Sequence, residues 1–477
     1  MRTDGWRRGA LIAVGIGIIP FLLLPGRAYL TDPGTLAALI LLELILAALW
    51  RYNTRFFLVL LGAFLWAGIP IPFGVAWSTG RWFVLAIAAL AGCILYLKER
   101  QLHLTAFHFA AFICAGTALV SAQVSAYPRV ALLKSLSLAL LFLYSATGAR
   151  LGALGREREF LHCFMIGCEA MVYVAATAYF GFHYPLLGNP NSLGAVMGVV
   201  AVPVFLWGIL SSEDRALRVR FTFAVVVALL LLFSSYARAG IMAATSTSLL
   251  LCLTLRRYRV LMKGICLALL LATLAAALLP REDRSAGSLT STFLYKGKRE
   301  QGLLGSRRSL WDETVAVIQE HPWLGVGFGT SKTGDEETLA QPTAFESEAP
   351  TTREHGSSYL AITEWVGLLG DVPFLFLLLL VVTNIGRVVI ALRRSGGVAS
   401  PVVPVAMVVA AGLVHAAFED WLFAVGYYLC VLFWSFAFIL VDLAPRAVAP
   451  LAAAPAVPVP WLGYRQTVFP ADHASVS

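Results

Sequence analysis

The feature that most constrains this chain is a succession of apolar runs long enough to cross a lipid bilayer. A helix needs about 17–25 residues to span roughly 30 Å of hydrocarbon. Runs of about this length recur along most of the sequence, separated by short polar segments. They predict fourteen transmembrane helices, at residues 9–25, 34–50, 56–70, 82–97, 105–122, 131–148, 160–181, 192–210, 221–236, 239–255, 261–279, 358–386, 402–418 and 421–441.

The composition agrees with a membrane protein. Of 477 residues, 59% are hydrophobic and only 13% are charged, whereas soluble proteins carry about 25% charged residues. The net charge of +9 would suggest nucleic acid in a soluble protein, but basic loops retained in the cytoplasm raise the charge of a membrane protein unaided. We therefore predict an all-α polytopic membrane protein, embedded in the lipid bilayer and without a nucleic-acid partner.

Two further features bear on class. The seven cysteines all fall in apolar stretches and none has metal-ligand spacing, so we expect buried thiols, no metal site and no cofactor. The N-terminus, Met1 to Arg8 followed by an apolar run, resembles a signal peptide. It lacks a small-x-small cleavage site and more spans follow, so we expect it to begin the first transmembrane helix.

Clusters of arginine and lysine sort the loops between the spans into two sides. One cluster precedes the first span, and the others follow even-numbered spans, such as Arg51 and Arg55 after the second. Because basic loops stay in the cytoplasm, this alternation predicts that both termini are cytoplasmic.

The same alternation places the one long polar segment, residues 280–357, on the outer side of the membrane. Long segments are translocated largely regardless of charge, so its arginines and lysines do not contradict this topology. We divide the chain into a transmembrane bundle (1–279), a large periplasmic loop (280–357), transmembrane spans twelve to fourteen (358–444) and a flexible Ala/Pro-rich cytoplasmic tail (445–477).

The outer loop contains the stretch "SRRSLWDETVAVIQEHPWLG", which predicts an amphipathic helix ending before Pro322. Apolar side chains recur there at intervals of three and four residues, at Leu310, Trp311, Val315 and Ile318. Such a helix lies on the membrane surface or against the bundle. Arg307 and Arg308 stand at its N-terminal end, where an anion would meet guanidinium groups and free backbone N–H groups. Surface pairing of these arginines with Asp312 or Glu313 is the alternative.

The next stretch, "HPWLGVGFGTSK" at residues 321–332, has the glycines of a phosphate-binding loop at the wrong spacing. A Walker loop needs GxxxxGK[ST] and a dinucleotide loop needs GxGxxG between a strand and a helix. We therefore reject a nucleotide site. The glycines are expected to let the backbone bend tightly against the membrane surface and lead toward His355.

His355 itself stands just before an apolar helix that contains Glu364, in "REHGSSYLAITEWVGLLGDVPF". An isolated histidine at a helix start is more often a cap or a packed ring than a catalytic group. Catalysis by His355 stays one of two interpretations on this stretch alone.

Taken in order, these motifs resemble the O-antigen ligase/polymerase superfamily. The resemblance rests on Arg307-x-x-x-Trp311, on "HPWLGVGFG", on "HGSSYLAITEWVGLLG" and on "FSSYARAGIMA" at residues 233–243. Two departures from the family pattern concern the acceptor and subfamily. Gly356 stands in place of asparagine, and Arg238 lies three residues after Ser235 instead of directly after a serine.

The resemblance implies an enzyme of the bacterial inner membrane that acts on the periplasmic face. Its donor is an undecaprenyl-diphosphate-linked glycan, and its acceptor is a hydroxyl of lipid A core, of another glycan repeat unit or of a protein. The ligases of this family need no metal. A ligase-like transfer is our first interpretation, and a polymerase of lipid-linked repeat units is the alternative within the family.

A metal-free site must neutralise the diphosphate leaving group with fixed cations, and it must withdraw a proton from the acceptor. On the family pattern we expect Arg238 and Arg307 to grip the diphosphate and His355 to activate the acceptor hydroxyl. The expected substrate-binding residues are Arg308 as a further cation, Glu354 and Glu364 beside His355, and Tyr359.

A transporter of lipid-linked glycans is the rival class. Transporters usually show internal repeats and broken helices at the middle of the membrane. This sequence shows no obvious repeat, and its polar residues are concentrated in an outer loop. Two intramembrane carboxylates, Glu43 and Glu169, are expected to be buried structural partners or to line the path of the lipid tail.

Overall fold

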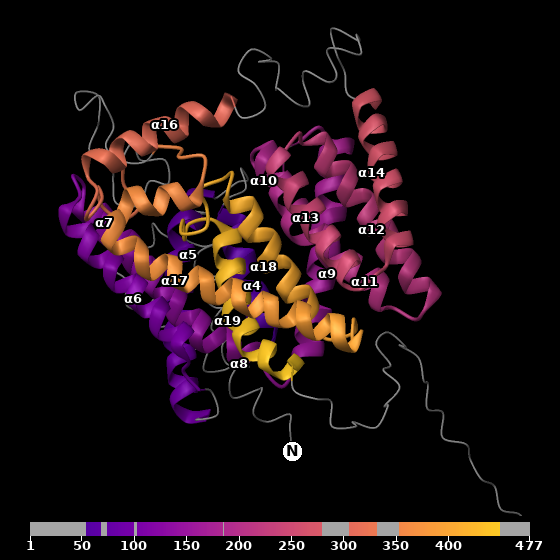
Figure 1. Cartoon of the computed structure of the whole chain (residues 1–477), viewed down its shortest axis with the longest axis horizontal. Coiled ribbons are helices and arrows are strands. Elements are labelled where there is room, and N and C mark those ends of the chain that lie inside the picture. Colours follow the sequence, from indigo (N-terminus) through magenta and orange to yellow (C-terminus); the bar gives the residue numbers. More distant parts are fainter. Residues whose placement is uncertain are drawn as a thin grey trace, which may run out of the picture.

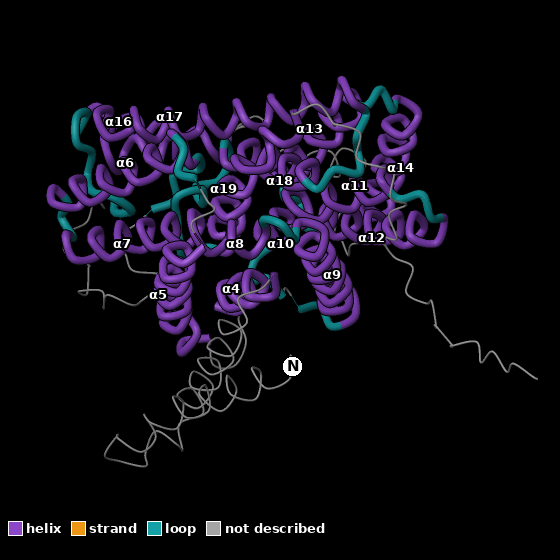
Figure 2. The backbone as a smooth tube through the Cα atoms, turned by 90° about the horizontal axis from the view of Figure 1, so that it is seen from below, coloured by secondary structure: helices purple, strands orange, loops and turns teal. Residues whose placement is uncertain are grey.

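The computed structural model describes residues 54–67, 74–99, 103–184, 186–278, 305–331 and 353–448. All regular elements in these ranges are helices (Figures 1 and 2), which confirms the all-α prediction. The first half of the described chain contains α4 (Thr54–Ala67), α5 (Gly74–Glu99), α6 (Ala106–Ser121), η1 (Ala122–Val124), α7 (Pro128–Tyr144), η2 (Ser145–Ala149), α8 (Arg150–Ala153), α9 (Glu157–Ala176) and η3 (Thr177–Gly181).

The second half of the described chain contains ten further helices. They are α10 (Pro190–Ala195), η4 (Val196–Ala201), α11 (Val202–Ser211), α12 (Arg215–Ser234), α13 (Arg238–Thr254), α14 (Tyr258–Leu278), α16 (Gly305–Glu320), α17 (Ser358–Ser395), α18 (Val402–Ala416) and α19 (Tyr428–Val448). Within the described ranges, eight helical segments are long and apolar enough to cross a membrane, and α13 and α18 are shorter apolar helices. The chain is therefore a polytopic membrane protein.

The predicted count of fourteen spans stays a prediction. The first two spans, 9–25 and 34–50, lie outside the described residues, and each of the other twelve contains a helix. The last prediction, 421–441, is wrong at its start, because α19 begins only at Tyr428. Trp421 and Leu422 are buried in the loop before it, so their apolar side chains pack inside a folded connection instead of continuing a helix.

Helix α19 continues to Val448, so the first residues of the predicted segment 445–477 are helical. The remainder of that segment lies outside the described residues.

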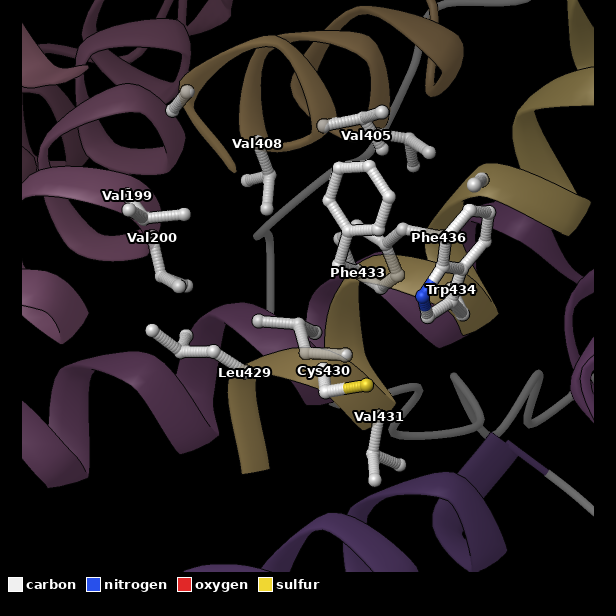
Figure 3. Close-up of a cluster of buried hydrophobic side chains, with 14 of the residues drawn as sticks. Val199, Val200, Val405, Val408, Leu429, Cys430, Val431, Phe433, Trp434 and Phe436 are labelled. Carbon is white, nitrogen blue, oxygen red and sulfur yellow. The ribbon is translucent and has the colours of Figure 1, made fainter. Parts of the chain in front are cut away.

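The hydrophobic core extends through the described helices, and Figure 3 shows the part of it where α18 and α19 meet η4. The large rings of Phe433, Trp434 and Phe436 are buried there, together with Val405 and Val408 of α18. Helices α5–α7 lie on one side of α18 and α19, and α11–α14 on the other (Figures 1 and 2). Helix α16 lies across one end of this bundle and packs on α17, which brings the polar segment before α17 to that end.

Candidate active site at one end of the bundle

A break in α17 opens the helix to the preceding loop. Gly367 has φ +66° and ψ 177° inside the helix, a left-handed conformation that a residue without a Cβ adopts readily. The backbone N–H of Leu368 donates to the Pro322 carbonyl at 2.7 Å, and the N–H of Val326 donates to the Glu364 carbonyl at 3.0 Å. The broken helix therefore satisfies its free backbone groups with the glycine-rich turn.

The glycines of that turn serve this docking. Gly325, Gly327 and Gly329 have φ values of +69°, +110° and +70°. A Cβ on Gly325 would lie 2.4 Å from the Glu364 carbonyl oxygen, and one on Gly327 would lie 2.2 Å from Ser125 Cβ. The predicted tight bend is present, and it packs against α17 and the residues around α7. Ser331, at the end of the turn, is thereby placed beside His355.

Helix α16 confirms the predicted amphipathic helix in part. Its buried face includes Thr314, whereas Val315, which we expected on that face, is 41% exposed. Thr314 instead faces the polar site beneath α16, where its hydroxyl receives a hydrogen bond from Arg353 at 3.1 Å. Trp311 Nε1 donates to the Gly356 carbonyl at 3.1 Å, so α16 is fastened to the segment that carries His355.

The loop between α18 and α19 reaches the same place from the other side. The backbone N–H of Ser358 donates to the Glu419 carbonyl at 3.1 Å, and the Ser358 hydroxyl accepts from the N–H of Leu422 at 3.0 Å. These bonds fix the loop against the first turn of α17. They present Glu419 and Asp420 to the residues before that helix.

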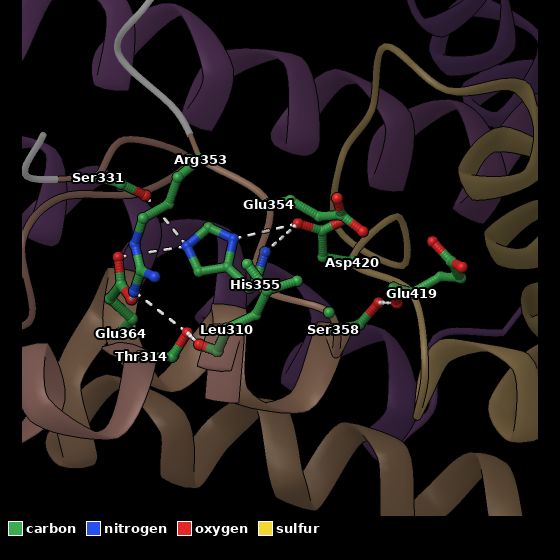
Figure 4. Close-up of polar contacts among 12 residues, drawn as sticks. Leu310, Thr314, Ser331, Arg353, Glu354, His355, Ser358, Glu364, Glu419 and Asp420 are labelled. Carbon is green, nitrogen blue, oxygen red and sulfur yellow. Dashed lines mark hydrogen bonds and ion pairs between the residues drawn. The ribbon is translucent and has the colours of Figure 1, made fainter. Parts of the chain in front are cut away.

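His355 is completely buried between two carboxylates (Figure 4). Its Nδ1 lies 3.1 Å from Asp420 Oδ2, which also accepts the His355 backbone N–H at 2.9 Å. Its Nε2 lies 3.0 Å from Ser331 Oγ and 3.2 Å from Glu364 Oε1. With the neutral-state proton assigned to Nδ1, facing Asp420, Nε2 carries the lone pair that a general base needs.

The groups around His355 change the pKa values of His355 and Asp420. Burial lowers the pKa of the His355 imidazole, but hydrogen bonds to Asp420 and Glu364 and the charges of these carboxylates outweigh it, so the pKa lies above its usual value near 6.5. Burial raises the pKa of the Asp420 carboxyl, but its hydrogen bonds with His355 hold that pKa below its usual range. The imidazole is thereby ready to take up and hold a proton.

Two arginines, Arg307 and Arg238, lie near His355 and its carboxylates. Arg307, at the start of α16, forms ion pairs with both Glu354 and Glu419, and its side chain is 14% exposed. Arg238 interacts electrostatically with Arg307, so the two guanidinium groups share one region. The side chain of Arg308 is 82% exposed, and its Nε lies 3.8 Å from Asp312 Oδ2. Arg308 therefore lies on the surface and apart from His355.

Close helix packing places Arg238. A Cβ on Gly194 would lie 2.1 Å from Ala237 Cβ, and one on Gly240 would lie 2.4 Å from the Gly194 carbonyl oxygen. These glycines let α10 and the start of α13 approach nearly to backbone contact. The arginine at the N-terminus of α13 is therefore held at the site end of the bundle.

Two other expected residues have structural contacts. The Tyr359 hydroxyl donates to the Leu413 carbonyl at 2.7 Å, which ties α17 to α18. Glu169 is buried and paired with Arg220, whose Nε lies 2.8 Å from Glu169 Oε1, in agreement with a structural partner. Glu43 lies outside the described residues.

Four polar residues of the site were not foreseen from the sequence: Ser331, Arg353, Glu419 and Asp420. The two acidic residues are adjacent in "FEDW", between the last two apolar runs. Two charges in a short connection between apolar runs are a signal that could have been followed. Nothing local distinguishes Arg353 or Ser331, because their roles come from contacts across the fold. Among the described residues, no group of three His, Cys, Asp or Glu side chains is arranged to hold a metal ion.

The comparison with known families falls on this site. Residues 223–370 match the family model described as O-Antigen ligase. This segment, about a third of the chain, is similar to O-antigen ligases. The matched segment contains Arg238, Arg307, His355 and Glu364, and it confirms the resemblance to the O-antigen ligase/polymerase superfamily. No curated protein matches the chain at a significant level.

The O-antigen ligase match supports a membrane enzyme of the ligase or polymerase type. Glu419 and Asp420 lie outside the matched segment, yet they complete the polar cluster. The site is therefore assembled from the segment that matches the O-antigen ligase model and from the loop that follows α18.

Proposed function

We propose that this protein transfers a glycan from an undecaprenyl-diphosphate carrier to an acceptor hydroxyl, in the manner of an O-antigen ligase, on the periplasmic face of the bacterial inner membrane. The observation that carries the proposal is the pairing of a carboxylate-held histidine with Arg307 at one end of a membrane bundle. A base and a cation are the two groups that a metal-free glycosyl transfer from a diphosphate requires.

In this reaction, a bond forms between the acceptor oxygen and the anomeric carbon while the bond from that carbon to the phosphate oxygen breaks. The hydroxyl proton goes to His355 Nε2, and Asp420 and Glu364 stabilise the resulting imidazolium. The Ser331 hydroxyl, 3.0 Å from Nε2, marks the position that the acceptor hydroxyl would take.

The bonding electrons leave with the carrier, so undecaprenyl diphosphate departs with one more negative charge. Arg307 and Arg238 neutralise that charge through charge-assisted hydrogen bonds. In the structure, Glu354 and Glu419 occupy Arg307. The diphosphate would replace these carboxylates on the guanidinium group.

The test is transfer by the purified full-length chain in liposomes, supplied with an undecaprenyl-diphosphate-linked glycan and without added metal. Lipid A core, a second lipid-linked repeat unit and a serine-containing protein are offered separately as acceptors. Glycosylated lipid A core together with free undecaprenyl diphosphate is the expected product. Elongation of the lipid-linked glycan instead would establish the polymerase.

The site variants make this test specific. His355→Ala and Arg307→Ala are each expected to reduce transfer by about 100-fold or more, because a positioned base and a fixed cation each contribute that much. The matched controls are His162→Ala and Arg215→Ala, since both side chains are exposed on other helices. Full activity in both site variants would overturn the proposal.

A further inference from the structure

Arg353 is a charged residue that the proposed reaction does not use. Its side chain is 12% exposed and lies between α16 and α17. Nη2 pairs with Glu364 Oε2 and donates to the Thr314 hydroxyl at 3.1 Å. Figure 4 shows it on the Glu364 side of His355, opposite Asp420.

This arginine is not placed as a purely stabilising group would be. Its Nε and Nη1 atoms are buried and find no hydrogen-bond partner among the described residues. Nη1 lies 3.4 Å from Glu313 Oε1, a carboxylate whose side chain is 59% exposed. A buried cation with unsatisfied N–H groups costs stability, so its strong contact with Glu364 points to another role.

Glu364 is the group through which Arg353 reaches the base. Its side chain is fully buried, with Oε1 facing His355 Nε2 at 3.2 Å and Oε2 facing Arg353. A buried carboxylate without a cation would take its counter-charge from the imidazole and keep it protonated. A permanently protonated histidine cannot accept a proton from an acceptor hydroxyl.

We propose that Arg353 is a positioning residue that sets the proton affinity of His355 by neutralising Glu364. The charged groups that face the imidazole are Asp420 from the α18–α19 loop and Glu364 from α17, with Arg353 behind Glu364 and the exposed Glu313 of α16 behind Arg353. One positive and two negative charges in this inner set leave a single net negative charge. That charge stabilises the imidazolium after proton transfer, but it does not keep His355 protonated before the transfer.

The proposal predicts opposite effects from the two partners. Arg353→Gln leaves two uncompensated carboxylates around His355, so the titration midpoint of His355 should rise by about one pH unit. Glu364→Gln removes a carboxylate, so the midpoint should fall. Arg353→Lys keeps the charge and should titrate as the native protein does. A residue that only held the fold together would not produce shifts of opposite sign.

The measurement is an NMR titration of the full-length chain in lipid nanodiscs with 15N-labelled histidine. The His355 signal is assigned by its loss in His355→Gln, and Arg215→Gln at an exposed site controls for a general loss of charge. The proposal is overturned if Arg353→Gln leaves the midpoint unchanged, or if both site variants move it in the same direction.

A double variant covers the case in which Arg353→Gln alone does not fold. Arg353→Gln with Glu364→Gln removes both charges of the pair, and its His355 midpoint should lie above that of Glu364→Gln alone. Equal midpoints in these two proteins would likewise overturn the assignment.

The catalytic meaning of this assignment rests on the proposed transfer, and a second readout keeps the two apart. In the transfer assay, Arg353→Gln should move the acidic limb of the pH profile upward by the same amount, lowering activity about tenfold on that limb and restoring it at high pH. If His355→Ala abolishes transfer but the titration does not respond to Arg353, only the role of Arg353 fails. If His355→Ala and Arg307→Ala both transfer normally, the proposed function fails whatever the titration shows.

Discussion

The two ends of α19 both hold buried arginine–carboxylate pairs, and the difference between them separates structure from function. At the far end, Arg150 binds Asp442 with two hydrogen bonds, of 2.6 and 2.8 Å, and its Nη1 and Nη2 also donate to backbone carbonyls at 3.0 Å. Every nitrogen of this guanidinium has a partner. Four of its five N–H donors are used in this way, so the pair holds helices together and leaves little for a ligand.

The end before Tyr428 is built in the opposite way. Carboxylates from four segments are shared among two arginines and a histidine, and two nitrogens of Arg353 have no hydrogen-bond partner among the described residues. Incompletely satisfied buried charges cost stability. This end therefore keeps charged groups available for exchange, which the proposed transfer needs.

The largest expected effects come from removing one carboxylate at each end. Asp420→Asn should lower transfer by about 100-fold or more, because His355 loses its partner, with little change in unfolding. Asp442→Asn should destabilise the fold by about 3–5 kcal/mol, because it leaves the buried Arg150 unpaired, while the folded fraction keeps its activity. Transfer assays and thermal unfolding in detergent measure both. Inactive but folded Asp442→Asn together with active Asp420→Asn would contradict this division of roles between the two ends.

The next effect concerns the break in α17 that supports the site. Gly367→Ala forces a Cβ to within 2.4 Å of Trp323 backbone atoms at φ +66°, so we expect a loss of about 1–3 kcal/mol and reduced transfer. Gly386→Ala, in the same helix, meets no atom within 4 Å and should be stabilising by about 0.5–1 kcal/mol. Unfolding of the two variants side by side tests this contrast. Equal stabilities would show that the break is not required.

Transfer and stability should both depend on pH through the titration of His355. Transfer needs the neutral imidazole, and the pKa of His355 is raised, so activity should increase as the pH rises through a value above 6.5. The same raised pKa contributes stability that is fully present below about 6.5, the unfolded value, and is lost as the pH rises through the folded pKa. His355→Gln should remove this pH-dependent part of the stability. Unfolding midpoints measured from pH 5 to 9 in both proteins would reveal an unchanged slope if the assignment is wrong.

The smallest effect is expected at Arg308, which the sequence suggested as a further cation. Its side chain is 82% exposed and its contact with Asp312 spans 3.8 Å, and exposed pairs of this kind contribute little. Arg308→Ala should keep transfer within about twofold of the native protein. A much larger loss would restore the sequence-based role and enlarge the cation site beyond Arg307 and Arg238.

Several residues of the site could be foreseen, because they lie in local sequence motifs. Arg307, Arg238, His355 and Glu364 were all expected, and the structure brings them to one end of the bundle. The partners that define their chemistry were not expected. Asp420 is 65 positions from His355 and Glu419 is 112 from Arg307, and no local periodicity connects residues across such separations. The glycine turn was foreseen as a bend but not as the partner of a broken helix.

The sequence by itself determined that this protein lies in a lipid bilayer and that its apolar segments are helices. Backbone groups in a bilayer must be satisfied within the segment, so apolar runs of sufficient length become helices whatever surrounds them. Only the tertiary structure decided that every guanidinium nitrogen of Arg150 has a partner, whereas two nitrogens of Arg353 have no hydrogen-bond partner among the described residues. That outcome depends on how many partners each side chain meets after packing, and on the burial that strengthens every charge among them.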